Sequence, residues 1–204
     1  MAAAGLTALT TFVTEANALD CSALTKSTRT IEMAATVRKN GESAGMSTYR
    51  IERGDHPLVT IRGADARVTV RTQFDGIMAL WSEGYLPDKP PRRQDFQYLN
   101  VQGRPTLLTE GATASWELRT IENGTVTSAA DARQTIGAHA SITLSGCRVA
   151  TVAVHREVVS KPSGAPSTFD WLFAPELGHW VGSTVKPPMH MVFEITATSI
   201  ELEK

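Results

Sequence analysis

Residues 30–37 read Thr-Ile-Glu-Met-Ala-Ala-Thr-Val, and apolar and polar side chains largely alternate along them. Successive side chains of an extended strand point to opposite faces. One face here carries only apolar side chains, those of Ile31, Met33, Ala35 and Val37. The stretch therefore predicts a half-buried β-strand, with one face against a core and the other in water.

The same alternation recurs in three further runs that end near residue 74. Asn40-Gly41 follows the first run, and this dipeptide favours the positive φ angles of a tight hairpin turn. Gly54-Asp55 interrupts the second run, and Pro57 begins the third. Residues 28–74 therefore predict a four-stranded antiparallel meander, which we place in a first β segment covering residues 28–81.

Residues 85–93 read Tyr-Leu-Pro-Asp-Lys-Pro-Pro-Arg-Arg, a segment unlike any regular strand or helix. Each proline removes an amide donor and fixes φ, so the segment predicts an extended, solvated crossover loop within residues 82–95. Three cations lie on this proline frame, at Lys89, Arg92 and Arg93. Three interpretations of these cations stay open. They are ordinary side chains of a solvated loop, they form a docking surface for an acidic partner, or they belong to a lid near Trp81, Tyr85 and Phe96.

The β pattern resumes in residues 96–204. Trp116, Leu118 and Thr120 alternate with charged residues, Asn123-Gly124 is a second hairpin signal, and residues 149–158 form a long β-branched run. We expect about ten to eleven strands and little helix, since no later window of about eleven residues keeps a 3.6-residue apolar stripe. The predicted fold is all-β: residues 19–204 form one domain, a strongly curved antiparallel sheet in a half-barrel or open barrel.

The N-terminal residues indicate export. Met1 to Leu24 is free of Lys and Arg and rich in Ala, Leu and Thr, and Ala16-Asn17-Ala18 matches a signal-peptidase site. We expect residues 1–18 to be a signal peptide or its remnant, with an ordinary N-terminal helix or tail as the alternative. Cleavage would leave Cys21 near the new N-terminus. A lipid-modified Cys21 is a competing idea, although Asp20 stands where a lipoprotein signal needs a small residue.

The chain has two cysteines, Cys21 and Cys147. In an exported protein an even pair predicts a disulfide, whereas in a cytosolic protein it would be two buried thiols. A bridge would close a loop of more than about 100 residues, which the chain-entropy model values at about 4 to 5 kcal/mol.

Composition narrows the function classes. The 204 residues are 42% hydrophobic and 20% charged, with a formal net charge of -1. Nucleic-acid binders carry a surplus of cations to neutralise phosphates, and this chain has none, so we expect no nucleic-acid partner. It also has no polybasic run for an anionic membrane and no apolar stretch of the roughly 18 to 20 residues that span a bilayer.

Residues 168–181 read Thr-Phe-Asp-Trp-Leu-Phe-Ala-Pro-Glu-Leu-Gly-His-Trp-Val. An aromatic strand that runs into Ala-Pro-x-x-Gly and returns as another strand resembles a recurring element of exported bacterial β-rich proteins of unknown function. Many of these are similar to the lipoprotein-carrier (LolA/LolB-like) architecture. The resemblance implies a curved antiparallel sheet around an apolar cavity. The common aromatic before Ala-Pro is Tyr, whereas Phe173 stands here, and the resemblance assigns no functional residue.

The same hairpin supplies the candidate ligand-binding residues, Phe169, Trp171, Phe173 and Trp180. Trp171 and Trp180 can face each other across the turn, where an aromatic pair contributes about 0.5 to 1 kcal/mol. The simplest interpretation is a hairpin that only packs. The alternative is that these rings contact a ligand.

No catalytic, metal or cofactor motif stands out. None of the five histidines forms a pair with metal-ligand spacing, and Gly-x-Ser-x-Gly and phosphate-binding glycine loops are missing. Asp170, Glu176 and His179 cluster in sequence and are the best candidates for acid–base chemistry.

These observations favour a non-enzymatic protein of the periplasm or the extracellular space. The expected partner is an apolar small molecule, lipid or acyl chain held in the concave sheet. The second hypothesis is a scaffold or adaptor that binds another envelope protein through a sheet edge or the proline-rich loop. The third is a hydrolase-like enzyme.

Overall fold

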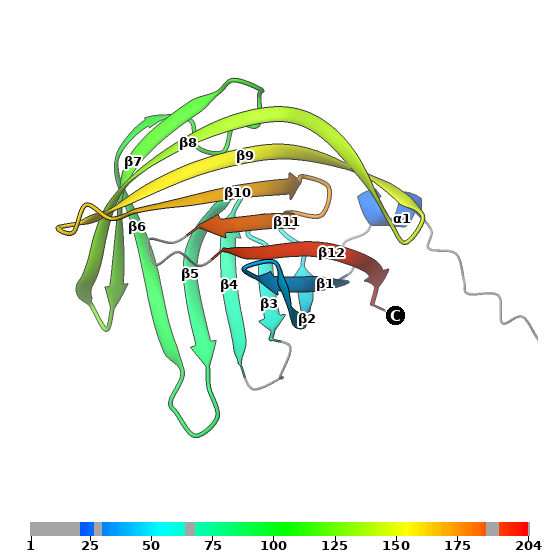
Figure 1. Ribbon diagram of the computed structural model, residues 1–204, viewed down its shortest axis with the longest axis horizontal. Coiled ribbons are helices and arrows are strands. Elements are labelled where there is room, and N and C mark those ends of the chain that lie inside the picture. The colour runs from blue at the N-terminus through cyan, green and yellow to red at the C-terminus, as the bar shows by residue number, and fades with distance from the viewer. Residues whose placement is uncertain (1–20, 27–29, 64–67, 187–191, 204) are drawn as a thin grey trace, which may run out of the picture.

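A computed structural model describes residues 21–26, 30–63, 68–186 and 192–203 (Figure 1). The predicted signal peptide, residues 1–18, lies outside the described residues. The described chain has one short helix, α1 (Cys21–Lys26), followed by twelve strands. These are β1 (Ile31–Lys39), β2 (Glu42–Glu52), β3 (Leu58–Arg62), β4 (Thr69–Asp75), β5 (Met78–Tyr85), β6 (Arg92–Gly103), β7 (Thr113–Glu122), β8 (Thr125–Leu144), β9 (Cys147–Lys161), β10 (Pro166–Ala174), β11 (His179–Lys186) and β12 (Phe193–Leu202).

The strands form a closed antiparallel barrel in which each pairs with its neighbours in sequence. The barrel closes where β1 pairs with β12, so Ile31 lies opposite both Ile51 on β2 and Leu202 on β12. The all-β, antiparallel prediction is confirmed, but the half-barrel of ten to eleven strands is wrong. A twelfth strand and the pairing of the two outermost strands give every strand two neighbours.

Closure also changes the adaptor hypothesis. A free sheet edge offers unpaired backbone groups to a partner strand, and a closed barrel has no such edge. Among the twelve described strands none lies at an edge. No whole strand is therefore an edge, but β6 pairs with β5 only through residues 92–95 and β12 with β11 only through residues 193–196. The adaptor hypothesis keeps these unpaired stretches and the proline-rich loop.

The predicted first meander is β1 to β4. Asn40 and Gly41 have φ angles of 52° and 83°, as the hairpin signal requires. The β10–β11 turn also follows its sequence pattern, because Pro175 comes directly after β10 and Gly178 has a φ of 66°. A Cβ at Gly178 would in addition lie 3.2 Å from Pro57, so both the positive φ and the close approach favour glycine there.

The proline-rich segment is a hairpin loop rather than a crossover. β5 continues to Tyr85 and β6 begins at Arg92, so the irregular segment covers residues 86–91 instead of 82–95. The two strands pair antiparallel, with Trp81 opposite Asp95. The prolines all lie in the loop, where no ladder hydrogen bond is needed, and therefore they do not interrupt the strands.

The barrel is filled at the end where α1 packs. Figure 1 shows α1 beside the turn between the long, arched β8 and β9. The disulfide between Cys21 and Cys147 joins them, with a Cα–Cα distance of 5.3 Å, which confirms the predicted bridge. Leu24 of α1 is 2% exposed within the largest apolar cluster, and Arg53 donates a hydrogen bond to its carbonyl oxygen. The helix thus closes this end of the barrel.

Candidate ligand-binding interior

The four candidate aromatic residues gather inside the barrel on β10 and β11. Trp171 and Trp180 stack with ring centroids 4.5 Å apart and an interplanar angle of 27°, as predicted for a pair across the hairpin. Phe173 meets Trp180 edge-on at 4.9 Å, and Phe169 lies 5.3 Å from Trp171. One continuous aromatic surface therefore follows the inner face of β10.

A β-bulge interrupts the regular alternation of β11 beside this interior. Leu172 pairs with Gly182 and Phe173 with Trp180, so Val181 is the extra residue on β11. Such an insertion bends the strand and redirects its side chains. As a result, Trp180 and Ser183, three positions apart, both line the interior, and His179 also borders it.

These residues border a cavity of about 180 Å³. It is lined mainly by apolar and aromatic side chains, namely Tyr49, Ile61, Phe74, Trp171, His179, Trp180, Ser183 and Ile195. Ligand sites of drug size usually occupy about 300–1,000 Å³, so this cavity holds a ring or a short stretch of chain rather than a whole lipid. A longer ligand must extend along the aromatic surface of β10.

His179 is a buried polar group in this apolar wall. Its side chain is 3% exposed and lies between the rings of Tyr49, at 5.5 Å, and Phe74, at 5.8 Å. Within the described residues its Nδ1 atom has no hydrogen-bond partner. Burial lowers the pKa of His179 to about 3, because desolvation disfavours the charged imidazolium. The ring is therefore neutral at physiological pH.

A second polar group, Arg156 on β9, enters the interior beside the aromatic surface. Its guanidinium lies over the ring of Trp171 at 4.6 Å and over that of Trp116 at 5.0 Å. Its Nε and Nη2 atoms both donate to Oε1 of Gln134, at 3.2 and 2.6 Å, and Nη2 also donates to the carbonyl of Ile77 at 3.2 Å. Burial lowers the pKa of Arg156 to about 10, which still leaves it charged at neutral pH.

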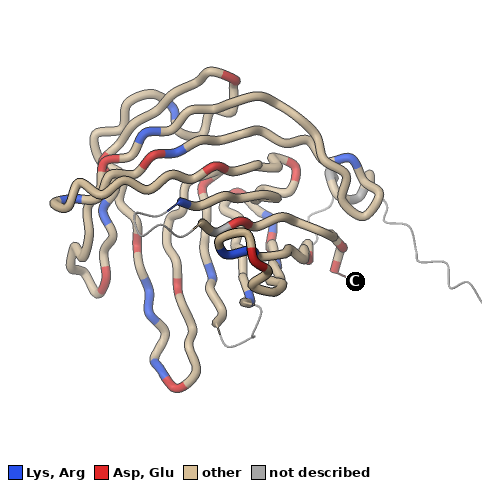
Figure 2. Tube along the Cα trace, viewed as in Figure 1, with Lys and Arg blue, Asp and Glu red and all other residues tan. Residues whose placement is uncertain are grey.

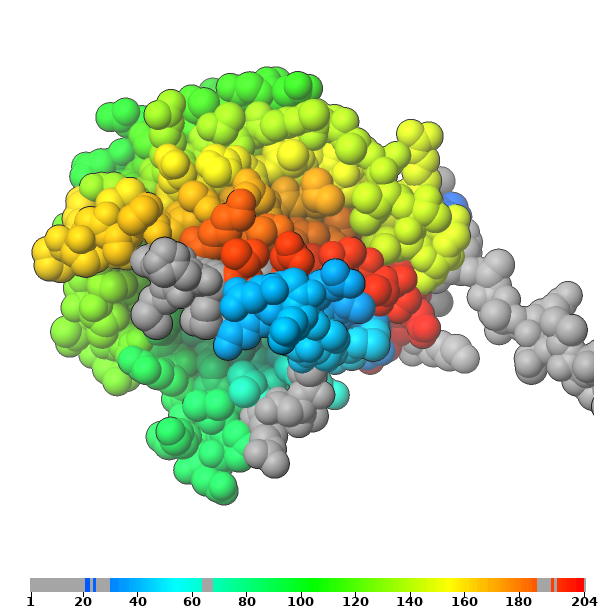
Figure 3. Space-filling model, in the orientation of Figure 1, coloured from blue at the N-terminus to red at the C-terminus, as the bar shows by residue number. Residues whose placement is uncertain are grey.

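The interior beyond Arg156 is less tightly filled than the α1 end. Inward-facing residues of β6, β7, β9 and β10 are all partly exposed there, among them Phe96, Leu118, Val158 and Phe169. Figure 3 shows the surface hollowed between the blue β1–β2 hairpin and the green strands below it. Solvent therefore reaches the inner face of the barrel from the end opposite α1.

A larger hollow of about 560 Å³ lies on the barrel wall across β9 to β12. Small residues such as Gly137, Ala153 and Gly182 leave room for it, and Leu172 lies over Gly182. On its rim His155 and Asp170 pair at 2.6 Å, with both side chains about half exposed. Its lining is largely apolar and shares Trp171, Ser183 and Ile195 with the cavity, but it is more open to solvent, so we place the candidate site at the cavity inside the barrel.

The structure separates the predicted acid–base cluster. Asp170 pairs with His155 on the outer face, His179 is buried in the interior, and Glu176 is exposed in the turn. Adjacent positions on a strand point to opposite sides of the sheet, so closeness in sequence does not bring these groups together. They form no common site.

The cations of the proline-rich segment are largely paired. Arg92 contacts Glu122 at 2.7 Å and Arg93 contacts Asp95 at 2.9 Å, and Arg93 also lies over the ring of Trp81 at 4.6 Å. Figure 2 shows acidic and basic residues interspersed along the strands. The segment therefore does not present a concentrated positive surface to an acidic partner.

Among the described residues no group of three or more His, Cys, Asp or Glu side chains could hold a metal ion. In the same part of the chain there is no helix with the length and hydropathy that a bilayer-crossing segment requires.

No protein-family model matches the chain, and no curated protein does. Several solved structures align with most of the chain. The hypothetical lipoprotein YmcC from Escherichia coli shares 11% identity and a TM-score of 0.46, with 90% of each chain covered. A β-barrel-like protein of the domain of unknown function DUF1849 from Brucella abortus shares 7% identity and a TM-score of 0.41, covering 86% of this chain and 98% of that one.

At such identities and TM-scores neither likeness says what this chain binds. Neither structure is described as a lipoprotein carrier. The resemblance of this chain to the LolA/LolB-like architecture therefore stays a prediction.

Sequence reasoning missed Arg156 and Gln134. Both lie on the inner face, where they pair across β8 and β9. In the β-branched run of residues 149–158, Arg156 has the same parity as Val152, Val154 and Val158. A charged residue that interrupts an apolar face was the available signal, because such groups are rarely buried without a reason.

Proposed function

We propose that this protein is a non-enzymatic exported protein that binds an apolar ligand, a lipid or an acyl chain, inside its β-barrel. The observation that carries the proposal is the cavity of about 180 Å³ beside the stacked rings of Trp171 and Trp180. Natural interiors are packed to crystal-like density, and empty apolar cavities large enough for a ring are few. A cavity of this size beside a partly exposed aromatic surface supports a binding role over a purely structural one.

The ligand enters from the end opposite α1. The α1 end is closed by the apolar cluster around Leu24 and by the disulfide. The inner faces of β6 to β10 are partly exposed at the other end. An apolar chain that follows Phe169 and Trp171 from this opening reaches the cavity at Trp180, which gives the aromatic surface on β10 a function.

Export to the periplasm or the extracellular space is part of the proposal. The Cys21–Cys147 disulfide supports it, because disulfides persist in oxidising compartments. Cleavage after Ala18 would place the new N-terminus close to the bridged Cys21. N-terminal sequencing of the protein from its own host tests this, and recovery of intact Met1 from the cytoplasm would contradict it.

The cavity can be filled by one substitution with a matched control. Ser183 on β11 lines the cavity opposite Trp171, whereas its neighbour Thr184 lies on the outer face opposite Asp170. Titration of the neutral dye N-phenyl-1-naphthylamine measures occupation of the interior through its fluorescence. We expect saturable binding to the wild type and to Thr184→Phe, and at least about tenfold weaker binding to Ser183→Phe.

The two variants separate binding in the barrel from adsorption to its surface. Circular dichroism and urea unfolding confirm that both variants are folded. Equal dye binding by Ser183→Phe and Thr184→Phe would show that the dye occupies another place. If the dye does not bind saturably to the wild type, the proposed binding function is wrong.

A further inference from the structure

Arg156 is a cation in the barrel interior without a counter-ion. Among the described residues no carboxylate lies within salt-bridge distance of it, and its hydrogen-bond acceptors are the amide oxygen of Gln134, the carbonyl of Ile77 and the sulfur of Met78. All three acceptors are neutral. Removing a guanidinium from water is costly, and proteins usually balance such a charge with a carboxylate. The uncompensated charge therefore requires an explanation.

The guanidinium also keeps donors available. Its Nε and Nη2 atoms are occupied by Gln134, Ile77 and Met78. Within the part of the chain that the structure describes, no acceptor bonds to the other terminal nitrogen, Nη1. This nitrogen is not among the fully buried polar atoms that lack a partner, so it is not completely enclosed by protein. It offers two N–H donors.

The surrounding residues fix the position of this charge. Gln134 is 1% exposed and is itself held by a hydrogen bond of 2.8 Å from its Nε2 atom to the carbonyl of Pro105. The rings of Trp116 and Trp171 cover the guanidinium. A charge fixed in advance binds an anion without losing side-chain entropy, which is the arrangement expected of a binding group.

The position of Arg156 relates it to the apolar path. It lies opposite Phe169 in the β9–β10 ladder, and its guanidinium lies over Trp171, whose other neighbour is Trp180 at the cavity. The charge is therefore beside the aromatic surface, between the opening and the cavity. A ligand with an apolar tail in the cavity would place its polar end near Arg156.

We propose that Arg156 binds the carboxylate of a long-chain carboxylic acid whose apolar tail occupies the barrel interior. This inference rests on the proposed function and specifies its ligand class. One guanidinium balances one negative charge, and its planar N–H groups match a carboxylate. A phosphate monoester would bring up to two charges, and no second cation bonds to this group among the described residues. The single cation favours the carboxylate.

The test uses three ligands with the same tail. Dodecanoic acid, dodecanol and dodecyl phosphate compete with N-phenyl-1-naphthylamine for the wild type at a pH where the acid is ionised. A hydrogen bond to a charged group contributes about 1.5–3 kcal/mol, so we expect the acid to bind about tenfold or more tightly than the alcohol. Dodecyl phosphate should not bind more tightly than the acid.

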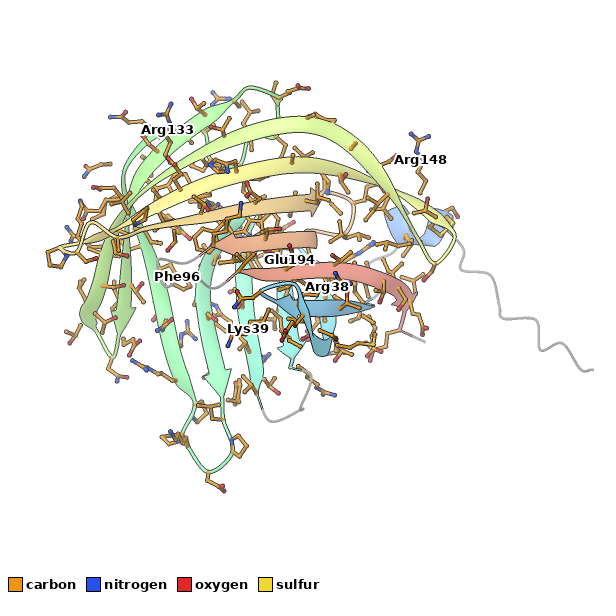
Figure 4. The ribbon with its side chains drawn as sticks, viewed as in Figure 1. Arg38, Lys39, Phe96, Arg133, Arg148 and Glu194 are labelled. Carbon is orange, nitrogen blue, oxygen red and sulfur yellow. A yellow bond between two sulfur atoms is a disulfide. The ribbon has the colours of Figure 1, made fainter. Side chains whose placement is uncertain are left out.

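Two substitutions test the residue. Arg156→Met removes the charge but keeps an apolar side chain, and should reduce the acid-to-alcohol preference to about one. The matched control is Arg133→Met, since Arg133 is adjacent to Gln134 on β8 but points away from the barrel (Figure 4). It should keep the wild-type preference.

Gln134→Glu provides a test that does not remove the cation. A glutamate here would supply the missing counter-ion to Arg156, so the preference for the acid should fall while the alcohol still binds. This variant keeps the guanidinium, although it removes the Nε2 donor to the carbonyl of Pro105. It therefore remains informative if Arg156→Met fails to fold.

The outcomes separate the two proposals. If the acid and the alcohol displace the dye equally in the wild type, the role of Arg156 is wrong and the apolar site remains. Tightest binding of dodecyl phosphate would overturn the carboxylate assignment. If no ligand displaces the dye or the dye does not bind, the proposed function itself fails.

Discussion

Trp171 on β10 and Trp180 on β11 stack inside the barrel with their ring centroids 4.5 Å apart. Trp171 touches the guanidinium of Arg156 on its other side, and Trp180 borders the cavity. The pair thus connects the charged group in the interior to the apolar cavity. Both rings are partly exposed although they face inward, as expected for side chains beside an unfilled space.

Trp180→Ala tests how much this pair stabilises the fold. Truncation of a packed Trp costs about 3–5 kcal/mol in a full core, and because Trp180 borders a cavity we expect about 3 kcal/mol. Trp81→Ala is the comparison, since Trp81 lies on the outer face, bonded to Gln73 and covered by Arg93. It should cost about 1 kcal/mol. Urea unfolding measures both, and equal losses would contradict the assigned interior position of Trp180.

The neutral, buried His179 makes stability depend on pH. Its pKa is lowered from 6.5 to about 3 in the folded protein, so between these values the unfolded chain binds a proton that the folded chain does not. The contribution of His179 is therefore complete above about pH 6.5, and the free energy of unfolding falls toward pH 3 by up to about 1.4 kcal/mol per unit.

His179→Phe should remove this part of the pH dependence. A phenyl ring fits the contacts with Tyr49 and Phe74 and eliminates the unpartnered Nδ1 atom. We expect the variant to be at least as stable as the wild type near pH 7.5 and more stable near pH 5, by about 1 kcal/mol or more. Carboxylates such as Glu117 titrate in both proteins, so the difference isolates His179. Parallel pH profiles would mean that His179 is not buried as described.

The disulfide should stabilise the barrel by closing a long loop. Cys21 and Cys147 are 126 residues apart. The chain-entropy model predicts that closing a loop of this length stabilises the folded state by about 4 to 5 kcal/mol, although measured effects are often smaller. The double substitution Cys21→Ser with Cys147→Ala should therefore lower the free energy of unfolding by about 2–5 kcal/mol. A reducing agent should destabilise the wild type to a similar extent and leave the double variant unchanged. If a reducing agent leaves the free energy of unfolding of the wild type unchanged, the disulfide does not stabilise the attachment of α1 to the barrel.

The sequence predicted the strands well because each depends on neighbouring residues. Alternation from Ile31 onward and the Asn-Gly turns at residues 40–41 and 123–124 act within a few positions. Closure depends instead on the pairing of Ile31 with Leu202, at opposite ends of the described chain. An alternating strand has the same appearance in an open sheet and in a barrel, so the local pattern could not distinguish them.

The sequence pointed only to the aromatic part of the candidate interior. Phe169, Trp171 and Phe173 share one parity on β10, and this alone placed them on one face. Arg156 and Gln134 belong to the same interior, but their pairing across β8 and β9 requires the register of those strands. For His179 the sequence was misleading. Its nearness to Asp170 in sequence indicated a common site, but the fold places the two side chains apart.

The central claim is that an apolar chain enters the barrel and reaches Trp171 and Trp180. Quenching of tryptophan fluorescence by a neutral brominated long-chain alcohol tests it directly, because bromine quenches only on contact. The Trp81→Phe variant removes the reporter on the outer face. We predict a saturable loss of most of the remaining emission, with an unchanged circular dichroism spectrum. Emission that stays constant up to the solubility limit of the alcohol would contradict the account.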